Sequence, residues 1–346
     1  MTSSQAHAAP RAMDTGAWRH AEQRLYDASP VGLGLTTVAL FTALVGVYAL
    51  AASIDGIPLI SRSGAGIAPD RRAWIAACLS LLICAALGLQ RYSRLKDVAE
   101  VGGFLAMVEP GIPWAPSFSS VRLRMFGVVG ALVGGGSMAW FLAHNADGRG
   151  PATSAWFTLA AAFLGVLFFR GVYMTRVAAG HTRAVLRPGL RIDLLRIEQL
   201  YPIGRSAGRT ALIWFTVSAS SLLLLVGSDI GGDTLVLGLA CAAMGVWVFV
   251  GTLSHIHDAI RAAKASELER LRAEIDAARA ALGADPAAPP KLQSLLAYEA
   301  RIAAAPEWPF DQTILVRVGA SALILTVPWF GQAFAGLVVE RFGKLF

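Results

Sequence analysis

Charged residues are scarce in this chain. Only 15% of its 346 residues are Asp, Glu, Lys or Arg, whereas soluble domains carry about 25%. Hydrophobic residues make up 55% of the sequence, which argues against an ordinary soluble domain and indicates a membrane protein. The surplus of basic over acidic residues, 30 against 23, could suggest nucleic acid. In a chain with many apolar runs, however, the placement of basic residues matters more than their sum, and we expect no nucleic-acid partner.

Acidic residues are missing from the apolar runs. None of the 23 lies in the core of a run long enough to cross a bilayer, which needs about 17 to 25 helical residues. Because lipid offers no partner to backbone groups and the runs lack the alternation of barrel strands, we predict an all-α, polytopic membrane protein. Transport driven by intramembrane carboxylates is disfavoured. The seven predicted spans are residues 31–54, 73–89, 123–143, 152–175, 211–227, 234–254 and 313–339.

The basic residues predict how the spans are oriented. Alternate loops, starting from the N-terminal tail, hold 24 of the 30 basic residues. Short cytoplasmic loops carry the Lys/Arg excess, so the N-terminus is expected inside and the C-terminus outside, in a cytoplasmic (inner) membrane of the prokaryotic kind. The spans then form three hairpins and a final span. A cleaved signal ending at "ALA" (49–51) is the alternative for the first span, although its apolar run is longer than usual.

Motifs for catalysis, cofactors and metals are also missing. No H-E-x-x-H, G-x-S-x-G, Walker or dinucleotide fingerprint occurs, so we predict no enzyme activity and no cofactor. His255 and His257 are two residues apart and diverge on a helix, which favours a hydrogen-bonded cluster over a metal site. Cys78, Cys84 and Cys241 lie inside spans without a C-x-x-C spacing and are interpreted as small packing residues.

The chain divides into four predicted regions. The regions are a cytoplasmic tail (1–30), the six-span bundle (31–254) with a basic amphipathic loop (176–210), a cytoplasmic antiparallel helical hairpin resembling a coiled coil (255–305), and a re-entry junction with the seventh span (306–346).

The six-span bundle contains Gly130 and Gly134 in a G-x-x-x-G pattern. This pattern allows two membrane helices to approach closely, within the chain or between subunits.

The basic loop is predicted to contain an amphipathic helix that starts at about Pro188. Its apolar face would consist of residues spaced by three or four, and its arginines would face the anionic headgroups of membrane lipids. Ordinary positive-inside anchoring and a specific lipid site are both open. The apolar face is Leu186, Leu190, Leu194, Ile197 and Tyr201, and the arginines are Arg187, Arg191 and Arg196.

The predicted hairpin carries a narrow apolar seam about two heptads long, formed by Leu268, Leu271, Ile275 and Leu282. Asp285 and the prolines that follow end the first helix, and a second apolar stripe follows on the return. The two helices pack on each other, or residues 258–304 meet a second copy of the chain or a cytoplasmic partner. Two heptads are too short for an independent coiled coil, which favours packing of the two helices on each other.

Three polar residues within spans are candidates for lipid binding or gating. Arg170 and Arg317 lie near the inner ends of their spans, with no acid at their depth. Each could extend its head to the lipid headgroups, bind a phosphate or line an inner vestibule. Gln332 lies in the last span, four residues after Pro328, where a helix break could free a carbonyl for a ligand.

Two functions remain open on the sequence. One is an oligomeric channel-type pore, or a carrier not driven by intramembrane carboxylates, with the hairpin used for assembly or gating. The alternative is a non-enzymatic scaffold or signalling subunit that docks a partner through the hairpin and binds anionic lipid through the basic loop. An intramembrane enzyme ranks third, because no catalytic set can be named.

Overall fold

The computed structural model describes residues 21–63, 66–105, 118–144, 150–186, 193–223, 232–282 and 288–308, with positions 316 and 319. These parts are almost entirely helical, as predicted. The elements are α1 (Ala21–Ala28), α2 (Gly32–Ile54), β1 (Ile60–Ser63), β2 (Gly66–Pro69), α3 (Arg71–Leu105), α4 (Ser120–His144), α5 (Pro151–Leu186), a 3-10 turn η2 (Ile197–Leu200), α6 (Tyr201–Leu222), α7 (Gly232–Ala280) and α8 (Ala288–Ala304).

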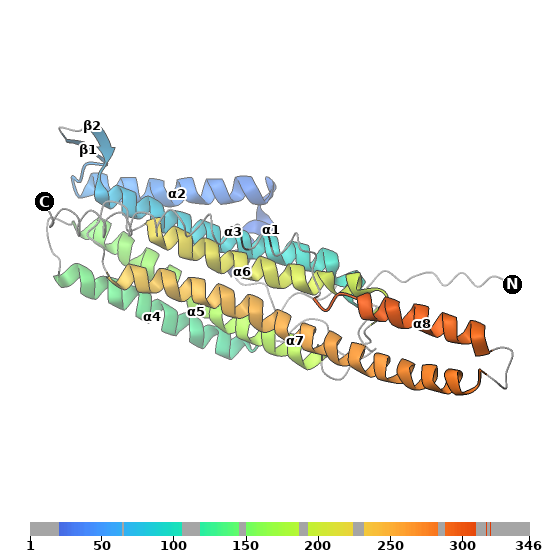
Figure 1. Ribbon diagram of the computed structural model, residues 1–346. Coiled ribbons are helices and arrows are strands. Elements are labelled where there is room, and N and C mark those ends of the chain that lie inside the picture. Colours follow the sequence, from blue (N-terminus) through green and yellow to red (C-terminus); the bar gives the residue numbers. More distant parts are fainter. Residues whose placement is uncertain are drawn as a thin grey trace, which may run out of the picture.

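The long helices lie side by side in an elongated bundle (Figure 1). α4 packs on α5, and α6 packs against both α3 and α7. The β1–β2 hairpin lies at one end of the bundle, here called the β end, and α8 lies at the other, the α8 end. α7 has 49 residues and is therefore about 74 Å long at 1.5 Å per residue, which exceeds a hydrocarbon core of about 30 Å.

Five of the described helices are long and apolar enough to cross a membrane. α6 corresponds to the predicted fifth span but is not among the five, and the predicted seventh span (313–339) lies outside the described residues except for two positions. The pairing of β1 with β2, from Ile60 opposite Pro69 to Ser63 opposite Gly66, was not predicted. The five helical segments are Gly32–Ile54, Arg71–Asp97, Ser120–His144, Pro151–His181 and Leu239–Ala280.

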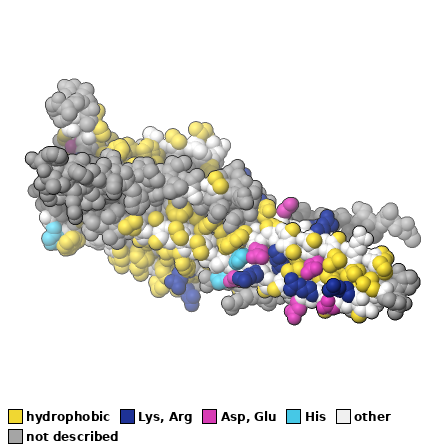
Figure 2. Space-filling model, viewed as in Figure 1, with side chains coloured by type: hydrophobic (Ala, Val, Ile, Leu, Met, Phe, Trp, Pro, Cys, Tyr) yellow, Lys and Arg dark blue, Asp and Glu magenta, His cyan; other side chains and the backbone are white. Residues whose placement is uncertain are grey.

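Polar and apolar side chains are separated along the molecule. On the face seen in Figure 2, hydrophobic side chains cover the described part of the bundle, whereas charged side chains gather over α7 and α8. Large apolar residues on α4 are exposed, among them Val121, Leu132 and Trp140. An exposed apolar surface of this extent is unusual for a soluble protein and suits contact with lipid.

Glycine brings α4 and α5 into backbone contact. A Cβ atom built on Gly130 would lie 2.3 Å from the carbonyl oxygen of Gly165, and one built on Gly134 would lie 2.2 Å from that of Ala161. No real Cβ occupies such positions, so these two helices approach as closely as only glycine allows. The partner of the G-x-x-x-G pattern is therefore α5 of the same chain.

Aromatic packing holds the β end of the bundle together. Tyr48 of α2 is 2% exposed, and its ring meets those of Trp156 and Phe157 of α5 edge to face, with centroids 5.2 and 5.7 Å apart. Such aromatic pairs stabilise a fold beyond the area that they bury. Cys78, Cys84 and Cys241 are all buried as well, which agrees with their predicted role in packing.

Asp55, which follows α2, caps the start of α5. Its carboxylate accepts hydrogen bonds from the backbone N–H of Ala152 (3.2 Å) and Thr153 (2.7 Å) and from the Thr153 hydroxyl (2.8 Å). Desolvation raises the pKa of Asp55, but these three hydrogen bonds outweigh it and lower the pKa below its ordinary value. A cap supplied by a residue 97 positions away joins two hairpins at the β end.

Substitution of Gly130 by alanine should destabilise the α4–α5 interface. The added Cβ meets a backbone carbonyl that cannot turn aside, so we expect the apparent free energy of unfolding in detergent to fall by about 1 to 3 kcal/mol. Gly136→Ala on the same helix is the matched control, because nothing lies within 4 Å of its Cβ position. Equal stability of the two variants would contradict the close contact.

The Asp55 cap predicts a dependence of stability on pH. A carboxylate whose pKa is lower in the folded state stabilises the fold above the unfolded value, about 3.9, and loses this effect as the pH falls through the folded pKa. Wild type should therefore melt at a higher temperature than Asp55→Asn at pH 7, and the difference should shrink below about pH 4. Melting curves of both proteins at pH 7, 5 and 3 measure it, and a constant difference would speak against the cap.

Candidate functional site

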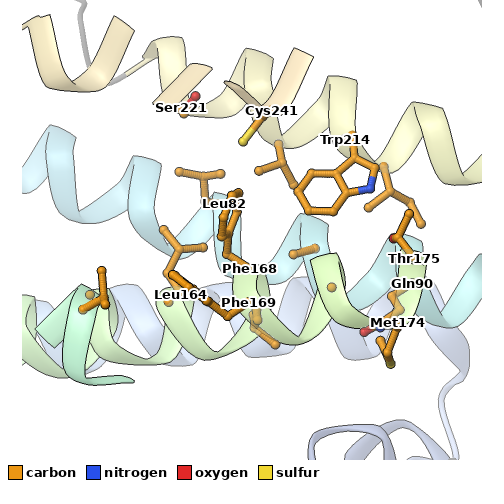
Figure 3. Close-up of a pocket in the computed structure, with 18 of the residues that line it drawn as sticks. Leu82, Gln90, Leu164, Phe168, Phe169, Met174, Thr175, Trp214, Ser221 and Cys241 are labelled. Atoms are coloured by element: carbon orange, nitrogen blue, oxygen red, sulfur yellow. The ribbon is translucent and has the colours of Figure 1, made fainter. Parts of the chain in front are cut away.

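A partly open cavity of about 490 Å³ lies between α3, α4, α5 and α6, with Cys241 of α7 in its wall (Figure 3). Small-molecule sites commonly occupy about 300 to 1,000 Å³ and lie between the helices of bundles. The cavity is bordered on α3 by residues from Leu79 to Arg94, which are 15 positions apart. At 1.5 Å per residue it therefore extends about 22 Å along that helix.

Apolar side chains form most of the cavity wall. Leu82 of α3, Leu164 and Phe168 of α5, and Trp214 of α6 line it. Phe168 and Trp214 meet edge to face, with ring centroids 5.6 Å apart. The hydroxyl of Ser221, which also lines this part, donates to the carbonyl of Ser218 in its own helix (2.7 Å), so the wall remains apolar in character.

Polar side chains gather at the end of the cavity toward α8. Gln90, Ser93 and Arg94 of α3 line this end together with Thr175 of α5 and Thr210 of α6. Gln90 and Thr175 lie close to Met174 in Figure 3, away from Ser221 and Cys241. The cavity is therefore amphipathic along its length, because its polar groups gather at one end, apart from the hydroxyls of Ser137 and Ser221, which bond within their own helices.

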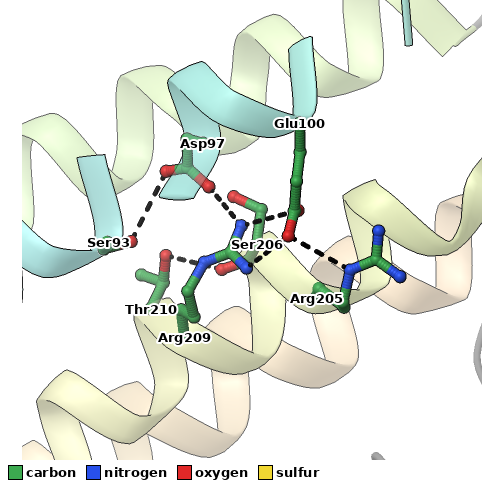
Figure 4. A network of polar contacts seen from close by, with 7 residues as sticks. All are labelled: Ser93, Asp97, Glu100, Arg205, Ser206, Arg209 and Thr210. Atoms are coloured by element: carbon green, nitrogen blue, oxygen red, sulfur yellow. Dashed lines mark hydrogen bonds and ion pairs between the residues drawn. The ribbon is translucent and has the colours of Figure 1, made fainter. Parts of the chain in front are cut away.

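An ion-pair network joins α3 to α6 beside this polar end (Figure 4). Arg209 of α6 donates to Asp97 (2.6 Å) and to Glu100 (3.0 Å), and Arg205 donates to Glu100 (3.3 Å). The Arg209 side chain is 13% exposed. Charge-assisted hydrogen bonds of this geometry are stronger than neutral ones, particularly where water is largely excluded.

Ser93 connects the network to the cavity. Its side chain lines the cavity, and its hydroxyl donates to Asp97 at 3.4 Å. The hydroxyl of Thr210, also in the cavity wall, donates to the carbonyl of Ser206 (3.1 Å) in its own helix. A molecule at the polar end would therefore lie within one side chain of the Asp97–Arg209 pair.

Neither the network nor the polar end was predicted. Arg205 and Arg209 lie in the predicted basic loop (176–210), for which no pairing with α3 was expected, whereas the structure pairs both with acids of α3. A signal was present: Arg205 and Arg209 are four apart and Asp97 and Glu100 three apart, so each pair lies on one helical face. The sequence could not show that the two faces meet.

Arg170 packs against the backbone of α4. Its Nε donates to the carbonyl of Leu123 (3.4 Å), and its guanidinium lies over Gly127, where a Cβ atom would be 2.7 Å from Nε. This contact with α4 was not among the three roles considered for Arg170. The other two candidates within spans, Arg317 and Gln332, lie outside the described residues.

The amphipathic helix that was predicted in the basic loop is not formed by residues 193–200. Residues 193–196 form a turn, and Ile197–Leu200 form a 3-10 turn before α6 begins at Tyr201. The Asp193 carboxylate accepts the N–H of Leu195 (3.0 Å), an Asx turn that competes with a regular helix. Leu186 ends α5, Arg196 is exposed, and Arg187 and Arg191 lie outside the described residues.

The seam on α7 is covered in part by the chain itself. Leu271, 1% exposed, belongs to a cluster with Ile302 of α8 and with Ile197 and Leu200, and Leu268 packs against the same cluster. Ile275 is also buried, whereas Leu282 is 46% exposed.

Polar contacts support the packing of α8 on α7. Tyr298 donates to Glu267 (3.2 Å), and Arg272 donates to Glu299 (3.3 Å). The segment after α8 also returns to α7: Lys264 donates to the carbonyl of Ala305 (3.0 Å), and the ring of His257 stacks on Trp308 with centroids 4.2 Å apart. The end of the hairpin is thus fixed to the middle of α7.

The helices define the class of the chain: it has the build of a multi-pass helical membrane protein. Comparison with protein families, with curated proteins and with solved structures gives no match. The function is therefore inferred from the geometry of the cavity and its surroundings.

Arg209 should contribute more to stability than its neighbour Arg205. Arg209→Gln removes the bonds to both carboxylates, and we expect a loss of about 1 to 3 kcal/mol in the free energy of unfolding. Arg205→Gln is the control, because its side chain is 42% exposed and makes one contact of 3.3 Å, for which about 0 to 1 kcal/mol is expected. Denaturation in detergent measures both, and a larger loss for Arg205→Gln would refute the ranking.

Proposed function

We propose that the protein is a membrane carrier that holds a lipophilic small molecule in the cavity between α3, α4, α5 and α6. The observation that carries the proposal is the cavity itself, about 490 Å³ of mostly apolar, partly open space between the helices. Burial of an apolar ligand is favourable by about 0.8 kcal/mol per methylene group, so this wall suits a hydrocarbon body.

The same wall argues for a carrier rather than an ion pore. An ion would have to pass Leu82, Leu164 and Phe168, which offer no oxygen ligands to replace its water. The missing acids in the predicted spans point the same way, since relay carboxylates are typical of ion-coupled carriers. We propose a carrier whose selectivity comes from its cavity.

The proposal also includes the orientation of the chain in the membrane. The α8 end is assigned to the cytoplasm, because the basic residues of α7, α8 and the loops beside them follow the positive-inside rule. The final span (313–339) would return the chain to the opposite side, which gives seven spans in the cytoplasmic membrane.

A scaffold is the second candidate, and the length of α7 favours it. α7 and α8 extend beyond the rest of the bundle, and Leu282 and Leu296 are 46% and 47% exposed there (Figure 1). A partner protein or a second copy of the chain could bind at these residues. Coverage of Leu271 by α8 leaves less of the seam for such a partner than the sequence suggests.

Filling the cavity should weaken ligand binding. Ala86 lines the cavity, and Ala86→Phe places a ring in the space. We expect tritiated hexadecanol to bind the purified protein in a scintillation proximity assay, and Ala86→Phe to weaken this binding at least 10-fold.

Leu81→Phe is the matched control, because Leu81 lies on the same helix, is 40% exposed and does not line the cavity. It should bind like wild type. A scaffold without a ligand site predicts that neither wild type nor the variants bind hexadecanol, and that result would overturn the carrier.

A further inference from the structure

We propose that the cavity is entered from the side, through an opening on α4 at Val133 and Ser137, and that its ligand is an uncharged lipophile dissolved in the hydrocarbon core of the membrane. This inference rests on the proposed function and adds the route of the ligand and its chemical class. It follows from the place where the cavity wall is exposed, from the depth of that place and from the groups around it.

The first step is the position of the opening. Among the residues of the cavity wall that the structure describes, Val133 and Ser137 are the only two that are exposed. Val133 is 52% exposed. The two residues are four apart on one helix, so they lie on the same face, one turn from each other. The exposed part of the described wall is therefore a single turn of α4.

The second step is the depth of this turn. α4 runs from Ser120 to His144 and is one of the helices long and apolar enough to cross a membrane. Val133 is 13 residues after Ser120 and 11 before His144, or about 20 and 16 Å from the two ends at 1.5 Å per residue. In a hydrocarbon core of about 30 Å it therefore lies near the middle. A ligand can reach the opening there only from lipid.

The third step is the chemistry around the opening. Val129 and Leu132 of α4 are 40% and 69% exposed, and α4 has no Asp, Glu, Lys or Arg after Arg124. The Ser137 hydroxyl donates to the carbonyl of Gly134 (3.1 Å) and is thus already bonded within α4. A charged group that passed here would lose its water without gaining a partner. A hydrocarbon chain would pass from lipid to a wall of the same character.

The fourth step is the opposite, polar end of the cavity. Ser93 is 6% exposed there, and Thr175 and Thr210 are half-buried. Beside them Arg209 of α6 binds Asp97 and Glu100 of α3, which holds these two helices together at this end. The described wall is thus more exposed on α4 than at the polar end, and we place the entrance on α4.

Exchange of a lipid-dissolved probe tests the opening. We expect hexadecanol with a trifluoromethyl end to give separate fluorine NMR signals in nanodisc lipid and in the cavity of wild type, and their exchange yields the rates of entry and exit. Val133→Trp narrows the opening and should slow both rates at least about 5-fold, with the Kd changed less than about 2-fold. A barrier shared by both directions leaves the equilibrium unchanged.

Leu132→Trp is the matched control, because Leu132 is the neighbouring residue, is exposed and does not line the cavity. It should exchange the probe like wild type. Ser137→Trp narrows the opening from the next turn and should also slow both rates, which keeps the test decisive if Val133→Trp does not fold. Val133→Ala should leave the rates equal or faster.

Amphiphiles with the same tail test the class of the ligand. At equal mole fraction in the lipid, hexadecyl sulfate and hexadecyltrimethylammonium should displace tritiated hexadecanol at least about 10-fold less effectively than unlabelled hexadecanol, because a charged head stays at the headgroup layer. Entry from water at the polar end predicts instead that a charged amphiphile competes at least as well as hexadecanol.

The outcomes separate the inference from the proposed function. If hexadecanol binds but the tryptophan variants at Val133 and Ser137 enter and leave like wild type, or weaken binding without slowing entry, the side entrance is refuted and the carrier stands. A charged amphiphile that competes as well as hexadecanol refutes the uncharged ligand in the same way. If wild type binds no hexadecanol, the proposed function itself fails.

Discussion

Inside a bilayer no water completes a hydrogen bond, and every polar group must find a partner in the protein. The backbone meets this requirement by forming helices, and the hydroxyls within them follow the same rule. Ser80, Ser137 and Ser221 each donate to a carbonyl three or four residues earlier in their own helix. Because these groups are satisfied locally, helices can pack without polar contacts between them, and a cavity among them keeps an apolar wall.

Contact between helices then depends on shape. Gly130 and Gly134 allow α4 to touch the backbone of α5, and Gly127 leaves room for the guanidinium of Arg170 one turn earlier. Larger side chains keep α3, α5 and α6 further apart, and the cavity lies where Phe168 and Trp214 do not fill the space between them. Toward α8, ion pairs also hold the helices together, because Arg209 of α6 binds Asp97 and Glu100 of α3.

The sequence predicts helices well and their neighbours poorly. The length of the apolar runs and their lack of charge suffice to predict that α2, α3, α4 and α5 are helices, because in lipid the backbone of an apolar run must satisfy its own hydrogen bonds. The G-x-x-x-G pattern indicates a close contact but not with which helix. Arg209 and Asp97 are 112 positions apart, so their pairing depends on how two helices rotate against each other, which no local pattern encodes. The helix predicted over residues 193–200 is wrong for a local reason, because an Asx turn at Asp193 forms in place of the helix that the apolar spacing indicated.

α7 connects two regions that differ in chemistry through one unbroken helix. Cys241 borders the cavity, and Leu271 is buried against α8, 30 residues further along, or about 45 Å at 1.5 Å per residue. Because the helix is continuous over this length, a tilt near the cavity displaces the far end of the helix. By simple geometry, a tilt of about 5° at Cys241 moves Leu271 by about 4 Å over that length. A change too small to alter the packing around the cavity is thus magnified at the far end of the helix.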